Sequence, residues 1–493
     1  MPRKALMTFI LAVLTTTLAT AQTVPVTILH YNDFHAANVS YRRVVHGDTL
    51  MVGGAANLDG YIEHFRATEP NALVFDAGDD FQGTPISMIT KGASQVTITN
   101  MIKPDAYEVG NHEFDYSVDT LIERLSHATY PVLSANVVWD STGKPIFTPD
   151  TVLTIAGVKV GVFGMMLDDF FGVTSPKKTQ HVKIANRDST IRAMLDNLEP
   201  RTDIQIMLSH CGVWEDSLIA AKYGDEIDLI VGGHSHTTLW EPKVVNGCPI
   251  VQAGSRGGFL GIVHLEVDTV ANRVTSFDGH LERTVLGKFP LDSALVAVVD
   301  AQEKEVSGKM DVVLANLKTD LPRYKDGTTP MGDWITDAYR SLTGTQISCV
   351  NTGGIRKEMF AGPMKLRDVM EISPFGNELE TFTTSGVTLR KIAEHQAKGG
   401  GRDNVVIFSG LTYKTKDGKL VDLRVNGKKV KAKKQYTFTA SDFVLDHSQD
   451  YFGLPKEEFK AERTGYLDRD ALVAYAKKYP EIEATVEKRV VRQ

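Results

Sequence analysis

The 493-residue chain has few cysteines, no excess of basic residues and, beyond its first residues, no long apolar run. Its three cysteines are Cys211, Cys248 and Cys349, which excludes a disulfide-stapled fold. One bridge would leave a thiol unpaired, and packing is the default role for each. The net charge of −7 and the pI near 6.1 give no sign of a nucleic-acid partner. Residues 483–493 are too charged for an anchor signal, so we expect no stable membrane anchor.

The N-terminus has the three parts of a secretory signal peptide. Arg3 and Lys4 form a small basic region, residues 6–18 are mostly apolar, and residues 19–21 (Ala-Thr-Ala) fit a small-residue cleavage site. The apolar run is too short to span a bilayer comfortably. We therefore predict cleavage after Ala21 and a periplasmic or secreted mature protein.

The composition, 42% hydrophobic and 23% charged, is typical of a globular protein. Short apolar runs of strand length recur, and each ends in a polar cluster; they cover residues 26–29, 72–75, 204–208 and 228–231. Helix-like stretches lie between them, at residues 55–66, 117–126 and 189–197. Alternating strands and helices predict an α/β fold, in which ligands gather at the carboxyl ends of strands.

The pattern changes near residue 285. Residues 291–310 read as a connecting helix, and residues 329–342 and 346–350 as a helix and a strand. Residues 405–439 have hairpin character, with turn signals at 416–418 and 426–427. We read the lysines of 428–434 as a solvated hairpin. The predicted domains are a signal peptide (1–21), a first domain (22–288), a connecting helix (289–312) and a second domain (313–493).

The stretch from Asn111 to Asp115 concentrates an amide, an imidazole and two carboxylates at the end of an extended segment. Asn111 can offer its carbonyl oxygen to a metal while His112 points elsewhere. Asp115 lies three residues after His112, so a helical turn would let it orient the imidazole. Glu113 has no role that we can assign. Alone, the stretch is equally consistent with a polar turn.

Asp, Asn or His side chains follow five predicted strands, all before residue 240. Mixed ligands of these types suit zinc, manganese or iron better than magnesium or calcium. With His112 set aside for chemistry, seven candidates remain, too many for one tetrahedral site and suited to two ions that share a carboxylate. Asp79 is the expected bridge. The candidates are Asp33, His35, Asp79, Asn111, His210, His234 and His236.

Five motifs resemble the calcineurin-like metallophosphatase signature and, more narrowly, the 5′-nucleotidase family. They are Asn-Asp-Phe-His at 32–35, Gly-Asp-Asp-Phe-Gln-Gly-Thr at 78–84, Gly-Asn-His-Glu-Phe-Asp at 110–115, Ser-His at 209–210 and Gly-Gly-His-Ser-His at 232–236. The resemblance covers nearly all of the mature chain. It implies a four-layer α/β/β/α metallophosphatase sandwich followed by a second α/β domain that binds substrate.

The resemblance also implies roles for the candidate residues. Asp33, His35 and His236 would hold one ion; Asn111, His210 and His234 would hold the other, with Asp79 bridging both. His112 would act on the phosphoryl oxygens or the leaving group, and Asp115 would orient it. Some nucleotidases carry an amide at the position of His236, whereas histidine there is common in the wider superfamily. Cys211, beside His210, is expected to pack.

The second half carries the motifs that imply substrate binding. The residues that match the family's motifs for holding phosphate and for sandwiching the nucleobase between aromatic rings are Asn351, Arg356, Phe375, Asn377 and Phe443. Asp450 resembles the acidic residue that binds the ribose hydroxyls. The spacing from Phe443 to Asp450 is slightly longer than usual. Without the resemblance, both phenylalanines would be read as core. An arginine that family members often carry is missing near Gly327, and either Arg323 or Lys325 would have to replace it.

The leading hypothesis is an exported phosphohydrolase that uses two divalent ions to release phosphate from nucleoside 5′-monophosphates. Alternatives within the family are a 2′,3′-cyclic-nucleotide phosphodiesterase, a UDP-sugar hydrolase and a hydrolase of carrier-bound sulfur esters. A non-catalytic nucleotide-binding surface protein is the alternative of another class, disfavoured because every ligand position is filled. The resemblance further implies that one domain rotates against the other. The sequence does not indicate an oligomeric state.

Overall fold

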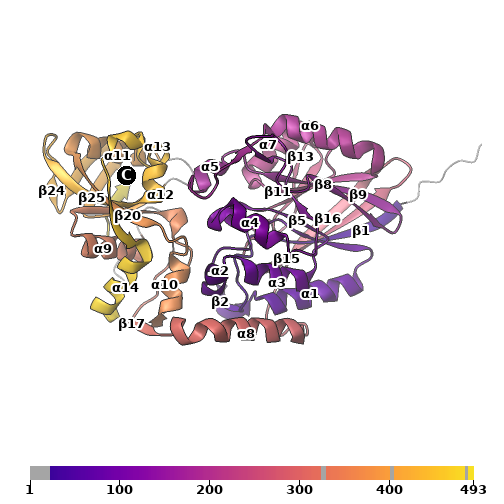
Figure 1. Cartoon of the computed structure of the whole chain (residues 1–493), viewed down its shortest axis with the longest axis horizontal. Coiled ribbons are helices and arrows are strands. Elements are labelled where there is room, and N and C mark those ends of the chain that lie inside the picture. The colour runs from indigo at the N-terminus through magenta and orange to yellow at the C-terminus, as the bar shows by residue number, and fades with distance from the viewer. Residues whose placement is uncertain (1–22, 324–328, 400–404, 484–486, 493) are drawn as a thin grey trace, which may run out of the picture.

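The computed structural model describes residues 23–323, 329–399, 405–483 and 487–492, which form two α/β bodies (Figure 1). The predicted signal peptide, with its cleavage site after Ala21, and Lys325 lie outside the described residues. Helix α8 (Ser293–Met310) runs along one edge of the molecule and leads from the first body to the second (Figure 1). It falls within the predicted connector, 289–312, and the domain boundaries themselves stay a prediction.

The first body contains two six-stranded sheets. In the first sheet, β1, β4, β5 and β6 are parallel, and β15 and β16 continue it in antiparallel fashion on the other side of β1. Its order is β16 (Arg273–Arg283), β15 (Phe259–Asp268), β1 (Thr23–Tyr31), β4 (Ala72–Asp76), β5 (Ala106–Glu108) and β6 (Val132–Leu133).

The second sheet has the same plan, with a parallel centre and antiparallel edges. Its order is β13 (Lys243–Val245), β14 (Cys248–Val251), β12 (Leu229–Gly232), β11 (Ile204–His210), β9 (Val158–Met166) and β8 (Asp150–Ile155). Two small two-stranded sheets are attached, β2 (Tyr41–Val45) with β3 (Asp48–Val52) and β7 (Val137–Trp139) with β10 (Val182–Ile184).

The two large sheets face each other across a core of fully buried aliphatic side chains, such as Val26 and Ile28 from β1 and Ile206 and Leu208 from β11. Helices α1 and α3 pack on the outer face of the first sheet, and α6 and α7 on that of the second. The layers are therefore α/β/β/α, as predicted. The helices are α1 (Ala55–Thr68), α2 (Pro85–Thr90), α3 (Ala93–Ile102), α4 (Val118–Leu125), α5 (Phe170–Val173), α6 (Arg187–Leu198), α7 (Val213–Tyr223) and the 3₁₀ turns η1 (Asn111–Tyr116) and η2 (Glu199–Arg201).

The second body is built on a five-stranded mixed sheet in the order β21 (Val406–Ser409), β18 (Ile347–Asn351), β25 (Gln435–Ser441), β20 (Glu378–Ser385) and β26 (Glu462–Leu467). Smaller sheets flank it: β19 (Gly362–Lys365), β17 (Val313–Leu317) and β27 (Glu481–Ile482); and β24 (Lys428–Lys429), β23 (Lys419–Val425), β22 (Leu411–Lys416) and β28 (Val490–Arg492). Its helices are α9 (Pro330–Thr343), α10 (Leu366–Ile372), α11 (Gly386–Ala397), α12 (Asp442–Asp446), α13 (Ser448–Phe452), α14 (Asp468–Lys478) and the 3₁₀ turns η3 (Thr352–Gly354) and η4 (Lys456–Glu458).

The predicted elements appear with small shifts at their ends. The connecting helix begins at Ser293, two residues later than predicted, because the Asp292 carboxylate accepts hydrogen bonds from the backbone N–H groups of Ala294 and Leu295 and so caps it. The predicted turns at 416–418 and 426–427 join β22 to β23 and β23 to β24. All three cysteines are buried and unbridged. Among the described residues, no helix is both long and apolar enough to cross a membrane.

Candidate metal centre

The carboxyl ends of β1, β4, β5, β11 and β12 and the loops that follow them meet at one edge of the two sheets. They carry all seven predicted metal ligands, with His210 as the last residue of β11. Two groups of three form there, each with one donor atom per residue and all donor atoms within 4.8 Å of one another. One group is Asp33, His35 and His236, and the other is Asp79, His210 and His234. The structure thus separates the predicted ligands into two neighbouring clusters, as two ions would require.

In the first cluster, His236 Nε2 lies 3.1 Å from Asp33 Oδ1 and 2.9 Å from His35 Nε2. His35 Nδ1 is 3.0 Å from the carbonyl oxygen of Gln82, which can only accept a hydrogen bond. Nδ1 therefore carries the hydrogen, and the lone pair of His35 Nε2 faces the other two residues. A carboxylate oxygen and two imidazole nitrogens turned toward one point form a donor set for a borderline divalent ion.

In the second cluster, His210 lies between two oxygens. Its Nδ1 is 2.6 Å from the carbonyl oxygen of Ala77, so Nε2 faces Asp79 Oδ2, 3.1 Å away. Burial alone would lower the pKa of His210, but the Asp79 carboxylate outweighs it and raises the pKa to about 10. The pair therefore favours a positive charge at this position. Asn111 Oδ1 lies 2.9 Å from His234 Nδ1 and completes the predicted set.

Five of the seven predicted ligands have a left-handed backbone, a conformation uncommon outside glycine. Their φ angles are 50° at Asp33, 50° at His35, 64° at Asp79, 71° at His234 and 51° at His236. Each such residue costs about 1 kcal/mol or more, and such residues cluster at functional sites. The chain therefore turns sharply after β1, β4 and β12, which directs these five side chains into one small volume.

Glu113, to which the sequence assigned no role, holds two of these loops together. Its fully buried carboxylate accepts hydrogen bonds from the backbone N–H groups of Asp79 (3.0 Å), Asp80 (2.7 Å), Phe81 (3.0 Å) and Gly110 (2.7 Å). The loop after β4 is thereby fixed to the loop after β5. In the sequence, a glutamate with this role looks the same as one exposed to solvent. The only indication of a role was that Glu113 lies within the densest polar motif of the chain.

His112 and Asp115 occupy one 3₁₀ turn, η1, in which residues three apart lie above one another. His112 Nδ1 is 2.9 Å from Asp115 Oδ2, and that carboxylate also accepts a 2.9 Å hydrogen bond from Gln82 Nε2. Burial lowers the pKa of His112, but the negative charges of Asp79 and Asp115 raise it by more, so the net effect is a raised pKa. His112 Nε2 faces the metal clusters, 4.0 Å from Asp79 Oδ2.

Side chains of the second body reach this centre. Arg356 Nη2 lies 3.0 Å from His35 Nε2, and the Phe375 ring stacks on the His112 ring with centroids 5.3 Å apart and planes 16° apart. The Arg356 guanidinium also lies over Phe375, 5.7 Å from the ring centroid. The two bodies therefore build one site, although their residues are more than 200 positions apart in sequence.

Three guanidiniums gather on this side of the centre. Arg323 Nη1 donates to the backbone carbonyl of Arg356 at 3.3 Å. The Arg323 side chain is exposed at the surface, but partial desolvation by its surroundings, and then the charges of Arg356 and Arg256, lower its pKa. Arg256 follows β14, and its backbone N–H donates to the carbonyl of Asp33 at 2.8 Å. It was missed in the sequence because no recognised motif includes it. Clustered arginines favour an anion.

A small pocket of about 100 Å³ lies between the bodies. Phe375, Asn377 and Phe443 line it together with Lys177 and other residues. Lys177 Nζ is 3.4 Å from Asp442 Oδ2 across the interface.

The two remaining predicted substrate residues lie differently. Asn351 is buried at the end of β18, where its side-chain amide donates to the Tyr451 hydroxyl at 3.2 Å. Asp450 is exposed in the first turn of α13 and does not line the small pocket; Asp446, one helix earlier, does.

Two family models match the chain. Residues 26–238 match the calcineurin-like phosphoesterase model, and residues 306–455 match the 5′-nucleotidase C-terminal domain model. The matched segments fall on the first and second bodies, and together they include all seven predicted ligands and all six predicted substrate residues.

Similar proteins cover most of the chain. A solved 5′-nucleotidase precursor from Thermus thermophilus is 26% identical, covers 95% of this chain and 99% of its own, and has a TM-score of 0.87. An apyrase from Tabanus yao is 27% identical over 92% of this chain and 91% of its own. The endonuclease YhcR from Bacillus subtilis is 26% identical over 93% of this chain, which spans only 40% of that protein's length. The resemblance in the motifs is confirmed: the chain belongs to the 5′-nucleotidase family of metal-dependent phosphoester hydrolases.

Proposed function

We propose that this protein releases phosphate from nucleoside 5′-monophosphates at the site between its two bodies. The observation that carries the proposal is the stacking of Phe375 on His112. Phe375 also borders the small pocket with Phe443, so a base held there would lie next to the metal clusters. Base–aromatic stacking is worth about 1–3 kcal/mol and tolerates different bases.

Two divalent ions, zinc, manganese or similar, are the proposed cofactors. Asp33, His35 and His236 would hold one, Asn111, His210 and His234 the other, and Asp79 would contact both. The geometry of the donors and the tautomers of His35 and His210 support this assignment. When bound, such ions polarise phosphoryl oxygens and provide a nucleophilic water near neutral pH.

His112 would donate a proton to the leaving oxygen or stabilise its charge, and Asp115 would hold the imidazole in orientation. The raised pKa of His112 supports this role because the protonated form then persists near neutral pH. Asp115 binds Nδ1, which leaves Nε2 directed toward the clusters.

Arg356 is the proposed phosphate ligand from the second body, with Arg256 and Arg323 beside it. Arg323 lies against Arg356, which supports it as the replacement for the arginine missing near residue 327. Asn351 and Asn377 would complete the polar contacts to the nucleotide. Asp450 stays the proposed ribose ligand, although it would need to approach the pocket.

Export to the periplasm or the outside, with cleavage after Ala21, is part of the proposal. It rests on the three-part N-terminal sequence pattern. Mass spectrometry of the mature protein should find Gln22 as its first residue. A chain that keeps Met1 would argue against export by this route.

A substrate panel tests the activity. Phosphate release from AMP should exceed release from UDP-glucose and 2′,3′-cyclic AMP, and EDTA should abolish it until manganese or zinc is restored. Turnover of either other ester without turnover of AMP would favour the corresponding alternative within the family. Adenosine binding by an inert protein would favour the non-catalytic alternative.

A His112→Ala variant tests the proposed proton donor. With AMP, kcat should fall by about 10²–10⁴-fold. With p-nitrophenyl phosphate the fall should be much smaller, because nitrophenolate leaves without a proton. Equal losses on both substrates, with unchanged metal content, would assign His112 to phosphoryl binding instead.

A further inference from the structure

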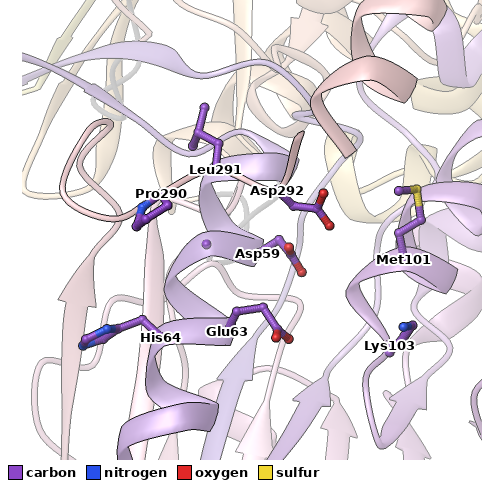
Figure 2. Close-up of a pocket in the computed structure, with 9 residues that line it drawn as sticks. Asp59, Glu63, His64, Met101, Lys103, Pro290, Leu291 and Asp292 are labelled. Carbon is purple, nitrogen blue, oxygen red and sulfur yellow. The ribbon is translucent and has the colours of Figure 1, made fainter. Parts of the chain in front are cut away.

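A second cavity, of about 490 Å³, lies in the first body away from the metal centre. Its walls come from α1, from the end of α3 and from the segment 290–292 that precedes α8 (Figure 2). Small-molecule sites have volumes of about 300–1,000 Å³, so the cavity has room for a small organic ligand.

Three carboxylates border this cavity, those of Asp59, Glu63 and Asp292. Figure 2 shows them turned to the same side, toward Met101 and Lys103 on the opposite wall. Two of the carboxylates have partners: Glu63 pairs with Arg66 at 3.1 Å, and Asp292 Oδ1 caps α8.

Asp59 differs from the other two because it is buried and has no partner. It is only 3% exposed. Among the described residues, no group donates a hydrogen bond to its carboxylate or forms an ion pair with it. The carboxylate therefore opens into the cavity with no protein group to neutralise its charge, which leaves a place for a cationic ligand.

The electrostatic surroundings of Asp59 also favour a bound cation. Burial raises the pKa of Asp59 to about 7, and the charges of Glu63 and Asp292 act in the same direction. Arg66 and Lys103 oppose them without outweighing them. Arg66 is held elsewhere, since it donates to the carbonyls of Ile102 and Lys103 as well as to Glu63.

The arrangement suits an organic ammonium better than a metal ion. A divalent metal requires ligand atoms close together, and in the described part of the chain only the two clusters of the metal centre bring three such groups within 4.8 Å. An ammonium group has three donors that can reach separate carboxylates. The side chains of Met101 and Leu291 provide apolar surface for a methylene chain.

We propose that this cavity binds an aliphatic di- or triamine, with Asp59 as its central ligand and Glu63 and Asp292 as secondary ones. The proposal does not depend on the nucleotidase activity, because none of these residues takes part in the metal centre or the substrate pocket.

Titration calorimetry with spermidine and 1,4-diaminobutane, at low ionic strength on the full mature protein, tests this. Wild-type protein should bind both amines, and Asp59→Asn should weaken binding at least about tenfold, since a charged hydrogen bond is lost. Lys103→Ala should tighten binding by removing a competing ammonium. Asp119→Asn, at an exposed position on α4, is the matched control and should bind as wild type does.

Asp59→Asn should keep wild-type turnover and melt no lower than wild type, which separates loss of a ligand from loss of the fold. Absence of amine binding to wild type, or equal binding by wild type and Asp59→Asn, would overturn the proposal. So would binding of calcium or magnesium that depends on Asp59 without any binding of the amines.

Discussion

At the scale of single residues, Glu113 is the group on which both ligand loops depend. Glu113→Gln would turn an amide N–H₂ toward backbone N–H groups that now donate to the carboxylate, and at least one of them would lose its acceptor. We expect a loss of about 2–4 kcal/mol in stability and weaker metal retention. Thermal unfolding and elemental analysis measure both. Glu123→Gln, at an exposed position, is the control, and wild-type metal content in Glu113→Gln would contradict this role.

A second prediction at this scale concerns Asp59 and pH. Its folded pKa, about 7, exceeds the unfolded value near 4, so the folded state binds more protons between these values. Its contribution therefore lowers stability as pH rises from 4 to 7 and stays unfavourable above 7, by at most about 4 kcal/mol. Asp59→Asn should melt above wild type at pH 8, and the difference should shrink toward pH 4. A difference independent of pH would contradict it.

At the scale of elements, the close approach of the loops after β4 and β5 makes glycine necessary at position 110. A Cβ there would lie 2.3 Å from Asp79 Oδ1 and 2.5 Å from the Asp79 backbone nitrogen. Gly110→Ala should therefore displace Asp79 and reduce turnover at least about tenfold, as misplaced reacting groups do. Gly308→Ala, inside α8 with open space around it, should instead stabilise the protein by about 0.5–1 kcal/mol. Turnover assays and melting curves of the two variants distinguish these effects. Wild-type turnover in Gly110→Ala would contradict the need for glycine at this position.

The order of elements and the convergence of strand ends could be predicted from the sequence because each apolar run ends in polar residues, a pattern that local chemistry produces. The strand-end positions of Asp33, Asp79 and His210 followed from the same rule. Contacts between distant loops could not be predicted. Glu113 acts by accepting hydrogen bonds from four backbone N–H groups, and Arg256 acts because the fold brings it near the centre. Neither role produces a recognisable residue spacing in the sequence. The two-residue shift at the start of α8 arose because Asp292 fits a cap as well as a first helical residue.

At the scale of the whole molecule, the two bodies meet in a closed arrangement. Arg356 reaches His35, Lys177 pairs with Asp442, and His447 Nε2 lies 2.9 Å from the carbonyl of Phe171. If the bodies must separate for product release, linking Lys177→Cys to Asp442→Cys with a short bismaleimide should suppress turnover. The native cysteines are buried, which limits side reactions. The same double variant capped with N-ethylmaleimide is the control; full turnover after linking would show that separation is not needed.

The reach of Arg356 into the metal centre has a consequence for how this architecture diversifies. All seven predicted ligands precede residue 240, whereas the predicted substrate residues follow residue 350. On the proposed assignment, hydrolytic capacity and choice of substrate would be inherited on separate stretches of one gene. Recombination or drift in the second stretch can change what is cleaved while the ligands stay untouched. Relatives named as an apyrase and a 5′-nucleotidase, which this chain matches at 27% and 26% identity over most of their length, are what such a division of inheritance would leave behind.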